Sequence, residues 1–140
     1  MRVLLISANT EMLPDPVAPL GPACVASALR KAGHDTRFLD LCFIENMEAA
    51  VRETVSDFRP DCIGVSLRNL DNVAFPDSVS YLPFYKKIAE TCRRVSAAPV
   101  FLGGAGFTLM PGPILEYLGA DGGIAGEGEE SFPALLSSGG

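Results

Sequence analysis

The stretch RVLLIS, residues 2–7, contains four consecutive branched apolar residues. An apolar run of this length without polar alternation is typical of a strand buried on both faces of a parallel sheet. The next stretch, GPACVASALRKAGH (21–34), predicts a helix, because Pro22 suits a first helical turn and Gly33 suits a helix end. The chain therefore begins with a strand that is followed by a helix.

The same alternation continues along the rest of the chain. The further strands are expected at residues 35–41, 61–67, 98–104 and the first part of 122–130. The further helices are expected from the cap Asn46 to Pro60, over 81–95, over 111–118 and from about Glu129 onward. These units predict an α/β fold of the flavodoxin-like, Rossmann-like type: a doubly wound parallel sheet of five strands in the order 2-1-3-4-5, with helices on both faces.

The size of the chain indicates one domain. It has 140 residues, of which 48% are apolar, enough for a core without disulfides or metals. The tail LLSSGG (135–140) is typical of a linker rather than of a helix or strand. We therefore expect a domain over residues 1–136 and a linker over 137–140.

Charge and cysteine usage exclude several classes of protein. Seventeen acidic and eleven basic residues give a net charge of −6, which argues against nucleic acid as a partner, and no basic cluster suggests a membrane surface. No signal-peptide pattern is present. The four cysteines lack the spacing of a metal site. We interpret them as buried core residues in a reducing compartment. They are Cys24, Cys42, Cys62 and Cys92. The protein is expected to be cytoplasmic.

The ligand edge of such a sheet is formed by the loops that follow the strands. Four loops are expected to converge there: 8–20, 67–80, 103–111 and 126–129. The first is longer than a usual connection and lacks a glycine-rich phosphate motif, which disfavours nicotinamide and FAD cofactors.

Three groups in these loops could contact a ligand, and the glycines among them suit a broad ligand better than a pyrophosphate. Arg68 and Asn69 can hydrogen-bond amides and phosphates. Gly103 and Gly104 leave a backbone surface without side chains, against which a flat or bulky group can lie. Glu127, between two glycines, can accept hydrogen bonds from ligand amides or hydroxyls.

Four stretches together resemble the N-terminal cobalamin-binding domain of cobalamin-dependent radical S-adenosylmethionine proteins. They are residues 19–41, GVSLRNLDN (64–72), FLGGAGFTLMP (101–111) and ADGGIAGEGEESFPALL (120–136). The resemblance implies that cobalamin lies over the carboxyl edge of the sheet, with its nucleotide tail against the paired glycines. The implied cofactor-binding residues are Asn9, Thr10, Ser66, Arg68, Asn69, Gly103, Gly104, Ala105, Gly106, Phe107, Thr108, Gly126, Glu127 and Gly128. Among them, the resemblance places Ser66 and Arg68 near the corrin ring.

One departure separates the chain from cobalamin mutases and methionine synthase, which carry D-x-H-x-x-G after the first strand. Residues 8–20 contain no histidine. This fits the radical proteins and implies base-off cobalamin without a histidine ligand. The only histidine, His34, follows the first predicted helix at the opposite, amino edge, where we expect it to be an exposed cap.

Relatives in that family continue into a radical S-adenosylmethionine domain with a C-x-x-x-C-x-x-C motif, which binds a 4Fe–4S cluster and S-adenosylmethionine. These 140 residues contain no such motif and no convincing pair of nucleophile and base. The resemblance therefore implies a cofactor-holding domain without catalytic or metal-ligating residues of its own, joined in cis to the catalytic domain of a parent methyltransferase.

A different class of function stays open as the alternative: a flavodoxin-like module that binds FMN or another small ligand without catalysis. Its mark would be a hydroxyl-rich phosphate loop after the first strand. The stretch ANTEMLPDP (8–16) supplies one threonine and no glycine. A response-regulator receiver is disfavoured, because it would need a lysine after the fourth strand and the last lysine here is Lys87.

Overall fold

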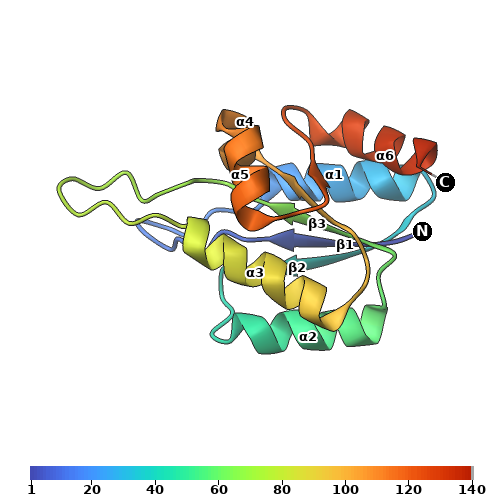
Figure 1. The fold of residues 1–140 in the computed structure, drawn as a ribbon, viewed down its shortest axis with the longest axis horizontal. Coiled ribbons are helices and arrows are strands. Elements are labelled where there is room, and N and C mark those ends of the chain that lie inside the picture. The colour runs from blue at the N-terminus through green and yellow to red at the C-terminus, as the bar shows by residue number, and fades with distance from the viewer. Residues whose placement is uncertain (140) are drawn as a thin grey trace.

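The computed structural model describes residues 1–139 and shows a single parallel sheet between two layers of helices (Figure 1). The strand order is β2-β1-β3-β4-β5, which confirms the predicted fold class. The strands are β1 (Arg2–Ser7), β2 (Asp35–Asp40), β3 (Cys62–Ser66), β4 (Val100–Gly103) and β5 (Gly122–Gly123). All pairs of neighbouring strands are parallel, as helical crossovers require.

The helices divide between the two faces of the sheet. They are α1 (Leu20–Lys31), α2 (Met47–Phe58), α3 (Leu82–Val95), α4 (Ala105–Leu109), α5 (Pro111–Leu118) and α6 (Gly128–Ser138). α1 and α6 pack side by side on one face, while α2, α3 and α5 cover the other (Figure 1). Because side chains alternate along a strand, β1 sends Leu4 and Ile6 to the core under α2 and α3, and Val3 and Leu5 to the core under α1 and α6.

Helices α1 and α2 begin or end at the boundary residues that the sequence indicated. The side chain of Asn46 accepts a hydrogen bond of 3.0 Å from the backbone N–H of Ala49 and so caps α2. Arg59 ends that helix in the left-handed conformation, directly before Pro60. Gly33, with φ +87°, follows the end of α1.

Several expectations differ from the structure. Residues 105–109 form the short helix α4, where the sequence suggested only a loop, and α6 runs through Ser138, two residues beyond the expected end of the domain. Cys24 is exposed, whereas the other cysteines are buried as expected. His34 is half-buried, and both ring nitrogens are buried without a hydrogen-bond partner, so it is not an exposed cap.

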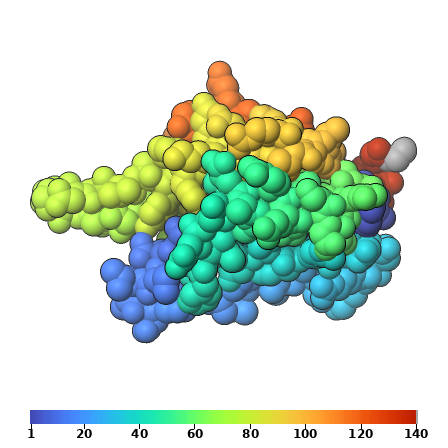
Figure 2. All heavy atoms as spheres, turned by 90° about the horizontal axis from the view of Figure 1, so that it is seen from below, coloured from blue at the N-terminus to red at the C-terminus, as the bar shows by residue number. Residues whose placement is uncertain are grey.

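The loop after β3 leaves the carboxyl edge as a projecting arm instead of folding over the sheet (Figures 1 and 2). An antiparallel bridge joins Asp71 to Ser80 at its base. The side chain of Asn72 accepts hydrogen bonds from the N–H groups of Ala74 and Val79. This arm, residues 71–80, exposes 96% of Phe75. In residues 1–139, no helix is long and apolar enough to cross a membrane.

Candidate functional site

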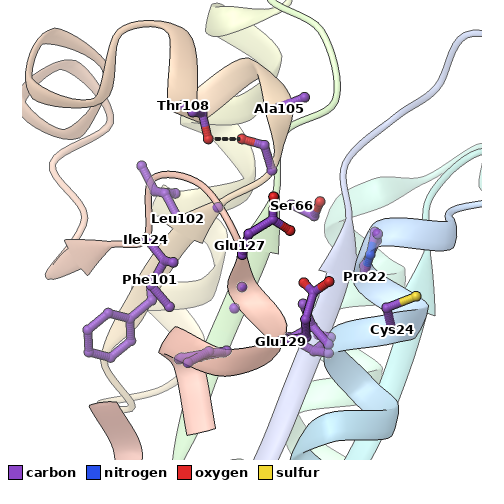
Figure 3. Close-up of a pocket in the computed structure, with 18 of the residues that line it drawn as sticks. Pro22, Cys24, Ser66, Phe101, Leu102, Ala105, Thr108, Ile124, Glu127 and Glu129 are labelled. Carbon is purple, nitrogen blue, oxygen red and sulfur yellow. Dashed lines mark hydrogen bonds between the residues drawn. The ribbon is translucent and has the colours of Figure 1, made fainter. Parts of the chain in front are cut away.

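A cavity of about 490 Å³ opens at the carboxyl edge of the sheet, between the N-terminal ends of α1 and α6 (Figure 3). Its floor is the carboxyl half of β3 and β4. This volume falls within the range of about 300–1,000 Å³ that small-molecule sites occupy. The lining includes Leu5, Leu20, Gly21, Pro22, Cys24, Val25, Gly64, Val65, Ser66, Phe101, Leu102, Gly103, Gly104, Ala105, Thr108, Ile124, Gly126, Glu127, Gly128, Glu129 and Phe132.

Small residues on two neighbouring strands create this cavity. Ser66 and Gly103 are paired in register between β3 and β4. Gly64 lies two residues before Ser66, so strand alternation places all three on the face covered by α1 and α6. A side chain at Gly103 would reach into the space that the two helices leave open, whereas a Cβ on Gly64 would lie 2.7 Å from Leu5 and 3.0 Å from Phe132.

Gly103 and Gly104 are glycines for different physical reasons. A Cβ on Gly103 would have a single neighbour within 4 Å, the carbonyl oxygen of Ile124 at 3.8 Å, so it would stand in the cavity. Gly104 has φ +93°, and its Cβ would lie 2.6 Å from the carbonyl oxygen of Leu67. Gly104 is therefore required by the backbone turn, and Gly103 alone forms the open surface that the sequence suggested for both.

The loop that carries Glu127 is fixed to α4 through one hydroxyl. Thr108 donates a hydrogen bond from Oγ1 to the carbonyl oxygen of Gly104 at 3.0 Å, drawn in Figure 3. Oγ1 of Thr108 in turn accepts a hydrogen bond of 3.0 Å from the backbone N–H of Gly126. Gly126 has φ +87°, which turns the chain into α6 and places Glu127 at the mouth of the cavity.

Eight of the predicted cofactor residues line the cavity. They are Ser66, Gly103, Gly104, Ala105, Thr108, Gly126, Glu127 and Gly128. The structure brings together the residues after β4 and after β5, which the sequence placed at one edge on topological grounds alone.

The remaining predicted residues lie outside the lining. In the loop after β1, Asn9 is buried and Thr10 is exposed. Arg68 is exposed and Asn69 half-buried at the base of the arm. These side chains stay at the carboxyl edge, above the sheet rather than within the cavity.

Gly106 and Phe107 belong to the packing that supports the site. The N–H of Gly106 donates a hydrogen bond of 2.9 Å to the carbonyl oxygen of Leu67. Phe107 is 2% exposed and belongs to the core under α3 and α5, with its ring against Gly123. A side chain so buried supports α4 from below and does not face the cavity.

Two tyrosines of α3 and its N-cap hold the two longest loops. The hydroxyl of Tyr81 donates a hydrogen bond of 2.6 Å to Oε2 of Glu11, which lowers the pKa of Glu11 and raises that of Tyr81 to about 12. The hydroxyl of Tyr85 donates to the carbonyl oxygen of Asn69 at 2.7 Å, and burial raises the pKa of Tyr85 to about 12. The loops after β1 and β3 are thus anchored to the same element.

Sequence reasoning missed much of the apolar lining. The first turns of α1 contribute Pro22 and Val25, and the far wall contributes Phe101, Ile124 and Phe132. Alternation along β3 and β4 could have assigned Phe101 to the same face as Gly103. The neighbourhood of α1 and α6 depends on a long-range contact between helices, for which the sequence carries no local signal.

The described residues contain no group of three or more His, Cys, Asp or Glu side chains arranged to hold a metal ion. Burial raises the pKa of Cys62 and of Cys92 to about 12, so neither supplies a thiolate near neutral pH. Besides apolar side chains, the cavity lining offers the hydroxyls of Ser66 and Thr108, the carboxylates of Glu127 and Glu129, and the exposed thiol of Cys24.

A family profile described as the B12 binding domain matches residues 6–136. The chain belongs to this family. This match confirms the resemblance to a cobalamin-binding domain that the sequence suggested. The B12-binding match spans all five strands apart from the first residues of β1, and it includes every residue that lines the cavity except Leu5.

Similar proteins are much longer than this chain. The tryptophan 2-C-methyltransferase of Streptomyces laurentii is 32% identical over 87% of this chain, which covers 20% of its length. The hopanoid C-3 methylase of Methylococcus capsulatus is 33% identical over 86% of this chain, which covers 22% of its length. The chain thus spans about a fifth of these curated relatives.

A solved structure with the same fold is that of TsrM from Kitasatospora setae, a radical S-adenosylmethionine methyltransferase with cobalamin and a 4Fe–4S cluster bound. It has a TM-score of 0.90 and 32% identity, and the match covers 98% of this chain and 24% of TsrM.

Proposed function

We propose that this B12 binding domain holds cobalamin at the carboxyl edge of its sheet, with the nucleotide tail of the cofactor in the cavity between α1 and α6. The observation that carries the proposal is Gly103, whose missing Cβ leaves a cradle that any side chain would fill. This cradle lies in the cavity at the carboxyl edge, where Gly103 of β4 is paired with Ser66 of β3.

The residues present fit this cofactor. An apolar slot of about 490 Å³ suits a flat base, and the hydroxyl group of Ser66 in the lining can contact sugar or base atoms. Glu127, exposed at the mouth, can accept hydrogen bonds from the amide side chains of a corrin. When bound, cobalamin supplies a cobalt centre that carries a methyl group.

We infer that the protein binds cobalamin base-off and gives cobalt no histidine. Support comes from the position of His34, which directly precedes β2 at the amino edge, opposite the cavity. Both of its ring nitrogens are buried without a hydrogen-bond partner. Arg68 is exposed at the ligand edge, but a guanidinium has no lone pair to offer a metal.

The parent protein that we propose is a methyltransferase in which a radical S-adenosylmethionine domain follows in cis. In that arrangement the second domain would hold the 4Fe–4S cluster and S-adenosylmethionine, and this chain would bind and orient the corrinoid. Support comes from the names of the relatives and from their length, because this chain covers about a fifth of the curated relatives. The cysteines of residues 1–139 are all free, which supports a reducing, cytoplasmic setting.

The binding experiment is reconstitution. The purified chain is incubated with hydroxocobalamin, desalted and scanned for corrin absorbance, and a parallel sample is loaded with FMN. We expect retained corrin and no retained flavin, because residues 8–16 after the first strand supply one threonine and no glycine to hold a flavin phosphate. Loss of corrin on desalting, with the chain folded by circular dichroism, would overturn the proposal, and retained flavin would favour the alternative module.

A further inference from the structure

Polarity changes with depth in the cavity. Its exposed lining residues include Thr108, Glu127 and Glu129, which gather at the mouth. The lining residues that are buried carry no polar side chain: Leu5, Gly64, Val65, Leu102 and Phe132. A ligand group at the inner end therefore meets no polar side chain.

The backbone of the cavity floor offers no free polar groups in compensation. β3 and β4 pair through four successive residues of each strand. Beyond this ladder, the N–H of Leu67 donates to the carbonyl oxygen of Gly103 at 2.8 Å, and the N–H of Ile124 donates to that of Leu102 at 2.8 Å. The floor is therefore already hydrogen-bonded within the sheet.

Ser66 is the single polar side chain at intermediate depth. Among the lining residues that are half-buried, the others are apolar or glycine. None of the hydrogen bonds formed by side chains of residues 1–139 uses its hydroxyl, which leaves that group for a ligand. One hydroxyl can donate a single hydrogen bond.

From this arrangement we propose that the cavity selects among cobamides by the polarity of the lower base and prefers a benzimidazole to a purine. The proposal rests on the proposed cobalamin site. A benzimidazole that does not coordinate cobalt has one unsubstituted ring nitrogen, which the hydroxyl of Ser66 can satisfy. Adenine in the same place adds two further ring nitrogens and an amino group, and these would be buried without partners.

The expected discrimination follows from the cost of an unpaired polar group. Burying one such group without a partner weakens binding by roughly tenfold, and two or more weaken it further. The carboxylates of Glu127 and Glu129 do not remove this cost, because both lie at the exposed mouth and not beside the inner apolar wall.

The test compares three corrinoids on the purified chain: cobalamin, the cobamide with adenine as lower base, and cobinamide, which has no base. Dissociation constants are measured by titration of corrin absorbance or calorimetry. We expect cobalamin to bind roughly tenfold or more tightly than the adenine cobamide, and also more tightly than cobinamide.

The outcomes separate this inference from the proposed function. Equal affinity for the two bases overturns the inference, and so does cobinamide binding as tightly as cobalamin, because the base would then gain nothing from the cavity. Both results leave cobalamin binding intact. If none of the three corrinoids binds to the folded chain, the proposed function itself fails.

A substitution in the cavity lining tests whether the lining causes the preference for benzimidazole over adenine. Val25 is half-buried on α1 and lines the cavity. In Val25→Asn, the new amide can pair with the polar edge of adenine, so we expect the ratio of the two dissociation constants to fall severalfold. The matched control is Val95→Asn, which changes a half-buried valine on α3 outside the lining. If Val25→Asn leaves the ratio of the two dissociation constants unchanged, the polarity of the cavity lining does not determine the preference between the two bases.

Discussion

The Cβ position of Gly103 lies 3.8 Å from the carbonyl oxygen of Ile124 and within 4 Å of no other non-neighbouring heavy atom. A side chain there has room in the free protein and takes that room from a ligand. We therefore expect Gly103→Val to fold normally, because valine suits a strand, and to weaken cobalamin binding by at least tenfold. Absorbance titration measures the affinity, and circular dichroism with thermal melting checks the fold.

Gly104→Val is the contrasting control. Gly104 has φ +93°, and its Cβ would lie 2.6 Å from the carbonyl oxygen of Leu67. Strain of this kind costs about 1–3 kcal/mol before the clash is counted, so this variant should lose thermal stability. If Gly103→Val binds cobalamin as wild type does while remaining folded, Gly103 does not form the cradle.

The fold was predictable because its signals are local. Apolar runs such as residues 2–7 and stops such as Gly33 and Pro60 are visible in short windows, and the handedness of crossovers then restricts the topology. Helix α4 escaped prediction because its five residues include Gly106, a poor helix former, and its formation depends on packing of Phe107 into the core.

The site was predictable only in part, because a cavity depends on which strands and helices lie next to each other in the fold. Gly103 was suggested by its place after a strand and Ser66 by the family resemblance, but their pairing follows from the register between β3 and β4. Gly64 and Val25 gave no signal, since their importance depends on α1 and α6 packing side by side. Gly104 was assigned to an open surface because a double glycine does not reveal which residue the backbone requires.

The anchor between Tyr81 and Glu11 predicts a change in acid stability. The hydrogen bond holds the pKa of Glu11 below 4.5 in the folded chain, so it stabilises the fold above that pH and is lost as pH falls through the lowered value. In Tyr81→Phe we expect a shallower loss of stability on acidification below about pH 4.5, measured by urea unfolding at several pH values.

The matched control for this variant is Tyr117→Phe. Tyr117 is an exposed tyrosine of α5, and its hydroxyl forms no hydrogen bond within residues 1–139. It should leave the acid profile as in wild type. Identical profiles for Tyr81→Phe and wild type would mean that the anchor is absent in solution.

The reactivity of the Cys24 thiol should report whether cobalamin occupies the cavity. It is exposed and lines the cavity, whereas Cys42, Cys62 and Cys92 are buried. In the native chain we expect one thiol to react rapidly with a disulfide reagent, and bound cobalamin to slow that reaction severalfold. Cys24→Ser should remove the rapid phase. A rapid phase that cobalamin leaves unchanged would place the cofactor away from the N-terminal end of α1.

The final prediction concerns the lower side of cobalt. His34 directly precedes β2, whose six residues at about 3.3 Å each separate it from the ligand edge by roughly 20 Å. No rearrangement of the ring alone spans that distance. We therefore expect the electron paramagnetic resonance spectrum of the bound cobalt(II) form to lack a nitrogen triplet splitting, in wild type and in His34→Ala alike. A triplet that disappears in His34→Ala would make His34 the ligand. A triplet that persists in the variant would show a base-on cofactor, and the nucleotide base would then not occupy the cavity beside Gly103.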